Sequence, residues 1–193
     1  MNAKNAPRTD VLANLLRSHP ETAYDYLEFR RLLAGQASAF AAERATPEDL
    51  ARLRACMEAM EAAHANDDPA EEAAADINFH MAIYKATHNA VMVHIMARLF
   101  ELLRQGVFFD RSDLYLRRGV RDGFLRQHQA LFKAISAGDA ATARGAAEAH
   151  LQSTVEALRE AQKADHRRDI SIRRRDGSGL VAKAGDKGKR LDK

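Results

Sequence analysis

Four potential metal ligands are spread along this sequence, namely Asp76, His80, His128 and His150. Asp76 and His80 are four residues apart, so on a helix they lie one turn apart on the same face and can bind one ion. His128 and His150 flank a turn-like segment, 136–139, at roughly equal distances, and a helical hairpin would hold both imidazoles at the same height. Three imidazoles and one carboxylate suit Zn²⁺, Ni²⁺, Fe²⁺ or Mn²⁺.

The spacing leaves a second interpretation open, in which the four side chains only hydrogen-bond each other or face water. The apolar neighbours Phe79 and Ile83 favour the metal, because a carboxylate at Asp76 that is buried beside them needs compensation. A cation supplies that compensation. We therefore expect a divalent metal ion at these four residues, with Zn²⁺ as the first expectation and Ni²⁺, Mn²⁺ or Fe²⁺ as alternatives.

Other metal and catalytic patterns fit less well. Di-iron carboxylate bundles need repeated Glu-x-x-His motifs, and zinc hydrolases commonly carry His-Glu-x-x-His with a glutamate base. This sequence has neither in matching positions, nor a glycine-rich phosphate loop, a nucleophile elbow or Cys-x-x-Cys. We therefore expect a protein that is not an enzyme.

A ligand-binding role follows from the number of ligands. An octahedral ion with four protein ligands keeps two positions that a small carboxylate or hydroxy acid can occupy. An arginine would complete the recognition of a carboxylate through its forked donors. Arg30 and Arg31 are candidates, and Arg30 neighbours an apolar stripe; a surface salt bridge between Arg30 and Glu28 is the alternative.

Composition indicates one ordinary globular domain. The chain has 193 residues, 46% hydrophobic and 30% charged, and Cys56, expected to be a buried thiol, is its only cysteine, which excludes an internal disulfide. Apolar runs are too short to span a bilayer and the start is polar, so we expect a cytoplasmic protein without membrane contact. Much of the basic excess behind the net charge of +3 follows Lys163; a disordered basic tail over 166–193 is expected, with nucleic-acid contact as the alternative.

Periodicity is helical nearly throughout. It predicts an all-α antiparallel bundle of six or seven helices over residues 21–165, after a linker over 1–20. One stripe of the first helix and one of the fourth are expected to face the core. The stripes consist of Phe29, Leu32, Leu33, Gln36, Ala37 and Phe40 in the first helix and of Val91, Ile95, Leu99, Leu102 and Leu103 in the fourth. Thr46, with Pro47 after it, is expected to cap the second helix. The expected helices cover about 24–44, 47–64, 69–86, 90–109, 125–135 and 140–163.

Several segments carry a resemblance through their order and spacing, namely Tyr26–Leu33, Ala41–Thr46, Asp76–His80, Thr87–Asn89, His128–Leu131, Ala137–Asp139 and Ala149–Leu151. Together they resemble the FCD domain, the effector-binding and oligomerisation domain of GntR-type transcription regulators of the FadR subfamily. The resemblance covers roughly residues 18–164. Within that group, the opening segment Ser18–Tyr26 is similar to the pyruvate dehydrogenase complex repressor and to the related lactate- and glycolate-responsive regulators, and the metal set is more similar to the latter two.

The resemblance implies a role for each of these residues. The four potential ligands would bind the ion, a small carboxylate effector of the lactate, glycolate or pyruvate class would complete its coordination, and Arg30 and Asn89 would face the effector. It also implies a homodimer, and DNA binding through a winged helix-turn-helix domain. That domain would precede the linker and is not in this sequence, whether because of a truncated gene model, an excised domain or a natural sensor fragment.

Three classes of function remain at this stage. The first is a metal-dependent small-carboxylate sensing domain of a GntR-type regulator, which we favour. The second is a helical metalloenzyme acting on a small organic acid, and the third is a metal-free helical interaction module.

Overall fold

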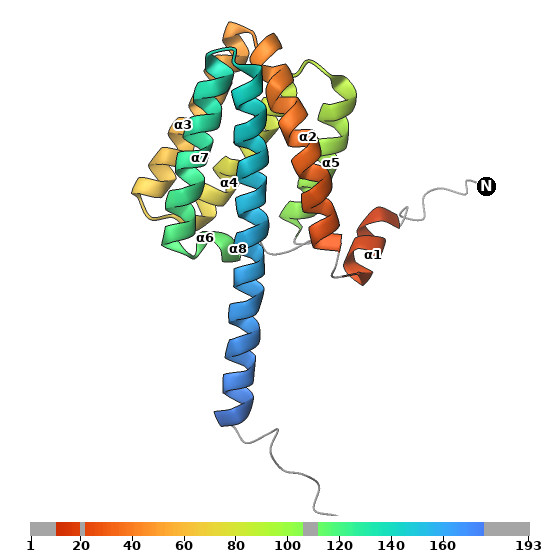
Figure 1. The fold of residues 1–193 in the computed structure, drawn as a ribbon, viewed down its shortest axis with the longest axis vertical. Helices are drawn as coiled ribbons and strands as arrows, with labels where there is room; N and C mark the ends of the chain where they lie inside the picture. Colours follow the sequence, from red (N-terminus) through yellow and green to blue (C-terminus); the bar gives the residue numbers. More distant parts are fainter. Residues whose placement is uncertain (1–10, 20–21, 106–111, 176–193) are drawn as a thin grey trace, which may run out of the picture. The chain divides into compact units, whose positions relative to one another are not determined.

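A computed structural model describes residues 11–19, 22–105 and 112–175. Over these ranges the regular secondary structure is helical and contains no strand, which confirms the all-α prediction (Figure 1). Within the predicted bundle range of 21–165, the described residues form seven helices, α2 to α8, as expected, and the additional helix α1 precedes this range. The helices are α1 (Val11–Ser18), α2 (Thr22–Arg44), α3 (Pro47–Ala65), α4 (Pro69–Ala86), α5 (Ala90–Arg104), α6 (Ser112–Tyr115), α7 (Arg118–Ser136) and α8 (Ala140–Arg175).

Caps and prolines set the beginnings of three helices. Thr46 caps α3 as predicted, in a capping box with Asp49, and Pro47 occupies the first turn. Asp68 caps α4 through the backbone N–H groups of Ala70 and Glu71, and Asn89 caps α5. These local signals explain why the connections between α2, α3, α4 and α5 are so short.

Helix α4 lies at the centre of the packing. It contacts α2, α3, α5 and α6, while α7 contacts α2, α3 and α6 (Figure 1). The apolar side chains Leu53, Met57 and Met60 of α3 are buried, and Leu50 is half-buried. Most of α4 is buried as well, because neighbours cover it on several sides, so polar groups on its inward face are removed from water.

The predicted apolar stripes of α2 and α5 are confirmed only in part. Ala37, Leu102 and Leu103 are buried, but other members of the two stripes face outward. Phe29 and Leu32 are 45% and 65% exposed, and Val91 and Ile95 are 67% and 44% exposed. Both helices carry more apolar residues than one face needs, so the pattern did not select the buried face. The buried residues are Ala23, Tyr26, Leu27, Arg30, Ala34, Gly35, Ala37, Ser38, Ala39 and Ala41 in α2, and Met92, Met96, Phe100, Leu102 and Leu103 in α5.

The expected linker and tail also contain helix. Residues 11–18 of the expected linker form α1, whose leucines recur at helical intervals. Residues 166–175 of the expected disordered tail continue α8, because no proline or glycine interrupts the sequence between Gly145 and Gly177 and arginine favours helix. Residues 1–10 and 176–193 lie outside the described part of the chain.

The chain divides into two compact units, residues 1–157 and 158–193. The boundary falls within α8, and each of the residues discussed below belongs to the first unit. None of the described helices combines the length and apolar composition that a membrane span requires. Cys56 is half-buried rather than buried, and its partial burial raises the pKa of the thiol.

Candidate metal centre

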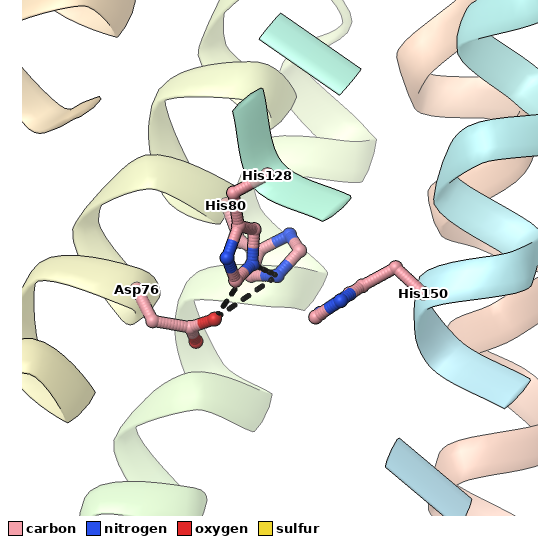
Figure 2. Close-up of side chains that lie close together, drawn as sticks. All are labelled: Asp76, His80, His128 and His150. Atoms are coloured by element: carbon pink, nitrogen blue, oxygen red, sulfur yellow. Dashed lines mark hydrogen bonds and ion pairs between the residues drawn. The ribbon is translucent and has the colours of Figure 1, made fainter. Parts of the chain in front are cut away.

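The four predicted ligands converge inside the first unit. Each of Asp76, His80, His128 and His150 offers one potential ligand atom, and these four atoms all lie within 4.8 Å of one another (Figure 2). Asp76 and His80 come from neighbouring turns of α4, His128 from α7 and His150 from α8. All four side chains are buried. The structure therefore brings together residues that are up to 74 positions apart in the sequence, from 76 to 150.

The distances between these atoms suit a shared ion. His128 Nε2 lies 2.9 Å from Asp76 Oδ1 and 3.3 Å from His80 Nε2, and His80 Nε2 lies 3.5 Å from Asp76 Oδ1. Ligand atoms about 2.1 Å from one zinc ion lie about 3 Å or slightly more from each other. Two imidazole nitrogens that face one carboxylate oxygen at this separation form a donor set suited to a divalent cation.

His150 is oriented by a neighbour that the sequence analysis missed. His150 Nδ1 donates a hydrogen bond to Gln127 Oε1 at 3.0 Å, which leaves the lone pair on Nε2. The amide orientation of Gln127 follows from its other end, since its Nε2 donates to Ser153 Oγ and Ser153 in turn donates to the carbonyl of Ala149. Only the fold could show this link, because Gln127 and His150 lie on different helices.

Aromatic rings surround the histidines. The ring centroids of Phe79 and His128 lie 5.4 Å apart, those of Phe124 and His150 5.3 Å, and those of Phe100 and His80 6.5 Å. Burial lowers the pKa of His80 well below 6.5, and the charge of Arg30 and the proximity of His128 lower it further. The imidazole of His80 is therefore neutral at pH 7, which is the form that binds metal ions.

Arg30 is placed beside this cluster but forms no hydrogen bond of its own there. Its side chain is completely buried, and none of its three guanidinium nitrogens has a hydrogen-bond partner among the described residues. Its Cζ lies 5.0 Å from the ring centroid of Phe100. The alternative salt bridge with Glu28 is therefore not formed. A buried cation without an anionic partner is costly, so this position favours an anionic ligand.

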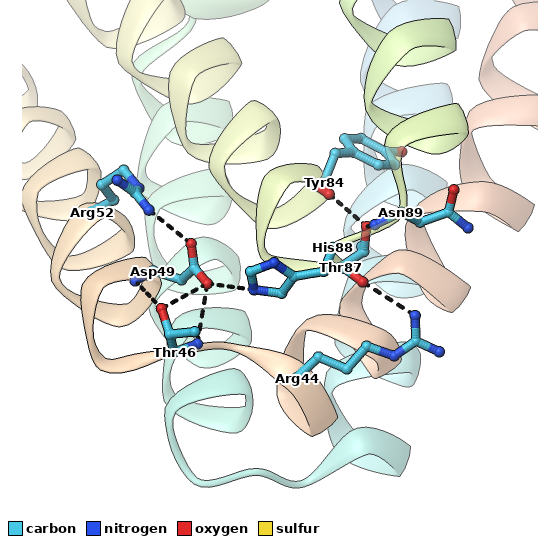
Figure 3. Close-up of polar contacts among 8 residues, drawn as sticks. All are labelled: Arg44, Thr46, Asp49, Arg52, Tyr84, Thr87, His88 and Asn89. Atoms are coloured by element: carbon cyan, nitrogen blue, oxygen red, sulfur yellow. Dashed lines mark hydrogen bonds and ion pairs between the residues drawn. The ribbon is translucent and has the colours of Figure 1, made fainter.

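Asn89 lies at the N-terminus of α5, where its side-chain oxygen accepts hydrogen bonds from the backbone N–H groups of Val91 and Met92 (Figure 3). His88, the residue before it, has a left-handed backbone with φ 53° and places its Nε2 2.8 Å from Asp49 Oδ2. Asn89 thus has a clear role in ending one helix and beginning the next. Its contact with an effector stays a prediction.

Asp49 holds the connection between α4 and α5 against the start of α3. Burial alone would raise its pKa, but hydrogen bonds from Arg52, Thr46 and His88 outweigh burial and hold the pKa well below 3.8 (Figure 3). Arg44 reinforces this junction by donating to the carbonyl of Thr87. The carboxylate is satisfied by groups of the chain itself.

Comparison with known proteins places this architecture in a family. The FCD domain family matches residues 25–153, which is most of the described bundle. The chain belongs to the FCD domains of GntR-family transcription regulators.

Two relatives are regulators in Escherichia coli strain K12. The chain is 38% identical to the putative L-lactate dehydrogenase operon regulatory protein over 140 residues, covering 72% of this chain and 53% of that protein. It is 32% identical to the Glc operon transcriptional activator over 161 residues, covering 82% of this chain and 63% of that protein. The chain thus spans between about half and two thirds of the length of these relatives.

A solved structure of E. coli McbR/YncC has the same fold. It superposes with a TM-score of 0.61 at 22% sequence identity, covering 71% of this chain and 64% of that one. This similarity supports the fold, and the function has to be argued from the site.

Proposed function

We propose that this domain senses small carboxylates of the lactate, glycolate or pyruvate class with the help of a divalent metal ion. The observation that carries the proposal is the buried guanidinium of Arg30, without a hydrogen-bond partner among the described residues, beside the cluster of Asp76, His80, His128 and His150. The names of the two relatives, which refer to an L-lactate dehydrogenase operon and a Glc operon, agree with this class of ligand.

The residues of the cluster fit a metal ion. Three imidazoles and one carboxylate would hold it, with Zn²⁺ as the first expectation, and the bound ion would supply a positive charge and open positions for an oxygen ligand. Asp76 and Arg30 cancel in charge, so a divalent ion leaves the buried site with an excess of positive charge. A small carboxylate reduces that excess and gives Arg30 an acceptor.

Signal transfer would then depend on the helices that the ligand joins. Arg30 lies on α2, and the four ligands lie on α4, α7 and α8, so a carboxylate held from both sides ties α2 to the other three helices. The ligand shifts the domain between two arrangements only by the difference in its affinity for them. We propose that DNA is bound through a winged helix-turn-helix domain joined to this one.

Metal content tests the first half of the proposal. The protein would be purified with Zn²⁺, Ni²⁺, Mn²⁺ or Fe²⁺ supplied, and metal would be measured by mass spectrometry for the wild type, Asp76→Ala and His150→Ala. We expect about one ion in the wild type and a strong loss in both variants. His94→Ala, which removes an exposed histidine of α5, is the matched control and should retain the ion. Unchanged metal in Asp76→Ala and His150→Ala would refute the site.

Ligand binding tests the second half. Calorimetry and thermal unfolding with L-lactate, glycolate or pyruvate, each with and without metal, should show metal-dependent binding in the wild type, because a ligand that binds the folded state raises stability. Arg30→Met should lose this binding and keep the metal. Turnover of one of these acids would instead indicate a metalloenzyme. A protein that neither metal nor acid stabilises would be a metal-free interaction module.

We also propose that the domain is a homodimer. The exposed apolar residues Phe29 of α2 and Ile95 of α5 line one groove of about 410 Å³, and Leu32, which is also exposed, lies one turn after Phe29 on α2. Contiguous exposed apolar surface of this kind is typical of protein contacts. Light scattering should give a dimer for the wild type and a monomer for Leu32→Glu. The control Leu116→Glu changes an equally exposed leucine elsewhere, and a loss of dimer in this control would contradict the assignment.

A further inference from the structure

The hydroxyl of Tyr84 is, like the guanidinium of Arg30, a buried polar group without a hydrogen-bond partner among the described residues. The side chain of Tyr84 is 1% exposed. Asp76, His80 and Tyr84 follow each other at intervals of four residues along α4, so they share one face of the helix. Tyr84 therefore lies one turn beyond His80, about 6 Å further along the helix axis.

Tyr84, Arg30 and His80 are arranged around one aromatic ring. The ring centroid of Phe100 lies 6.1 Å from that of Tyr84, 6.5 Å from that of His80 and 5.0 Å from Cζ of Arg30. Burial raises the pKa of Tyr84 further than the nearby charge of Arg30 lowers it, so the phenol remains protonated at neutral pH and can donate. The guanidinium of Arg30 and the hydroxyl of Tyr84 are thus two hydrogen-bond donors beside the candidate metal ligands.

We propose that the hydroxyl of Tyr84 donates a hydrogen bond to the same carboxylate that Arg30 binds. This inference rests on the proposed function and adds the residue that makes the site selective for an acid group. The two oxygens of a carboxylate offer about four acceptor positions, of which a forked guanidinium uses two, so an acceptor remains for Tyr84.

The ligand chemistry follows from the donors. An acid presents two oxygen acceptors to Arg30 and Tyr84, whereas the corresponding amide presents one oxygen and an NH₂ group that has no acceptor there. A site built from donors rejects a ligand that lacks the matching acceptor, because its buried polar groups then stay unpaired. The site should therefore bind L-lactate in strong preference to L-lactamide.

Tyr84→Phe tests this inference because it removes one oxygen and keeps the ring. We expect the metal-loaded variant to bind L-lactate, glycolate and pyruvate about ten-fold more weakly by calorimetry, equivalent to about 1.4 kcal/mol. Its preference for L-lactate over L-lactamide should fall by a similar factor, and its metal content should stay at the wild-type level. Tyr24→Phe removes the hydroxyl of a half-buried tyrosine six residues before Arg30 and is the control, expected to bind within twofold of the wild type.

The outcomes separate this inference from the function on which it rests. If Arg30→Met loses L-lactate but Tyr84→Phe binds it as the wild type does, Tyr84 is a packing residue and the inference is overturned, while the sensing proposal stands. If the metal-loaded wild type binds none of the three acids, both fail. A chemical-denaturation curve for Tyr84→Phe checks folding, and the loss of an unpaired buried hydroxyl should leave its stability unchanged or raised.

Discussion

Two buried arginines show opposite relationships to the rest of the chain. Arg121 of α7 is 3% exposed and donates from Nε to Glu72 and from Nη1 to Asp67, both at 2.7 Å. Arg30 of α2 is 0% exposed and has no hydrogen-bond partner among the described residues. The same type of side chain is neutralised by carboxylates of the protein in one place and has no anion among the described residues in the other.

The difference distinguishes an arginine that stabilises the fold from an arginine that is available to bind a ligand. The partners of Arg121 form a network, in which His64 also contacts Glu72 at 3.0 Å and Asp122 at 3.2 Å, so this cation fastens the turn between α3 and α4 to α7. A buried arginine that lacks such partners adds no comparable contact to the fold. Its position beside potential metal ligands therefore points to an anion from outside the chain, and the following predictions test that contrast.

The largest expected effect is on stability. Arg121→Met should lower the free energy of unfolding by about 3–5 kcal/mol, because the buried carboxylate of Glu72 loses its arginine and keeps only the contact with His64. Arg30→Met should leave the ligand-free stability unchanged or raise it, since it removes a buried charge and keeps an apolar chain of similar length. Urea unfolding of both variants measures the two values. Equal losses would mean that Arg30 has internal partners after all.

Removal of metal is expected to have the next largest effect. At a free metal concentration about a thousand times its dissociation constant, bound metal stabilises a folded protein by about 4 kcal/mol. Adding a chelator should therefore lower the melting temperature of the metal-loaded wild type and leave that of Asp76→Ala unchanged. An equal shift in the two proteins would show that the chelator acts elsewhere.

Asp49 is a buried anion with partners inside the protein, so it extends the comparison from arginines to carboxylates. It predicts that the stability of the protein depends on pH. The pKa of Asp49 in the folded state lies below its unfolded value of about 3.9. Its contribution to the free energy of unfolding is therefore complete above about pH 3.9 and is lost as the pH falls from there towards the folded-state pKa. Asp49→Asn should cost on the order of 1 kcal/mol at pH 7 and progressively less below pH 4. Urea unfolding at several pH values measures this, with exposed Asp25→Asn as control; a cost independent of pH would contradict it.

Asn89 is predicted to give the smallest effect. Asn89→Ala should lower stability by about 1 kcal/mol through loss of the cap of α5, and Asn89→Asp should retain the cap. Calorimetry with L-lactate then decides whether Asn89 has a structural role, like Arg121, or binds the ligand, as proposed for Arg30. If Asn89→Asp binds L-lactate with wild-type affinity, the role of Asn89 is structural. If both variants bind more weakly while Asn89→Asp keeps the wild-type stability, the amide of Asn89 contacts the ligand.

Much of the fold could be predicted because its signals are local. The cap at Thr46, Pro47 after it and the break at Thr87–Asn89 mark helix ends through backbone chemistry that depends on a few neighbouring residues. The face that each helix turns towards the core is not determined by such local signals. Phe29 and Leu32 lie outside although they are large and apolar, because small residues of α2 such as Ala34 and Ala37 occupy the packed face.

The candidate metal centre was predictable in its ligands and not in its surroundings. Asp76 and His80 are paired by helix geometry alone, and His128 and His150 by their distances from one turn. The surroundings depend on which helices become neighbours. This holds for the hydrogen bond from His150 to Gln127, for the pairing of Arg121 with Glu72 and for the position of Tyr84 beside Phe100. No pattern within a single helix records those contacts.

Helix α5 carries different surfaces on its two sides. Its inner side buries Phe100 against Arg30 and Tyr84, and its outer side exposes Val91 and Ile95. A rigid rotation of this one helix would therefore displace Phe100, beside Arg30 and Tyr84, together with the outer apolar surface. If a second copy covers that surface, acid occupancy and subunit affinity become thermodynamically linked, and tighter assembly must strengthen acid binding by the same factor as the acid strengthens assembly.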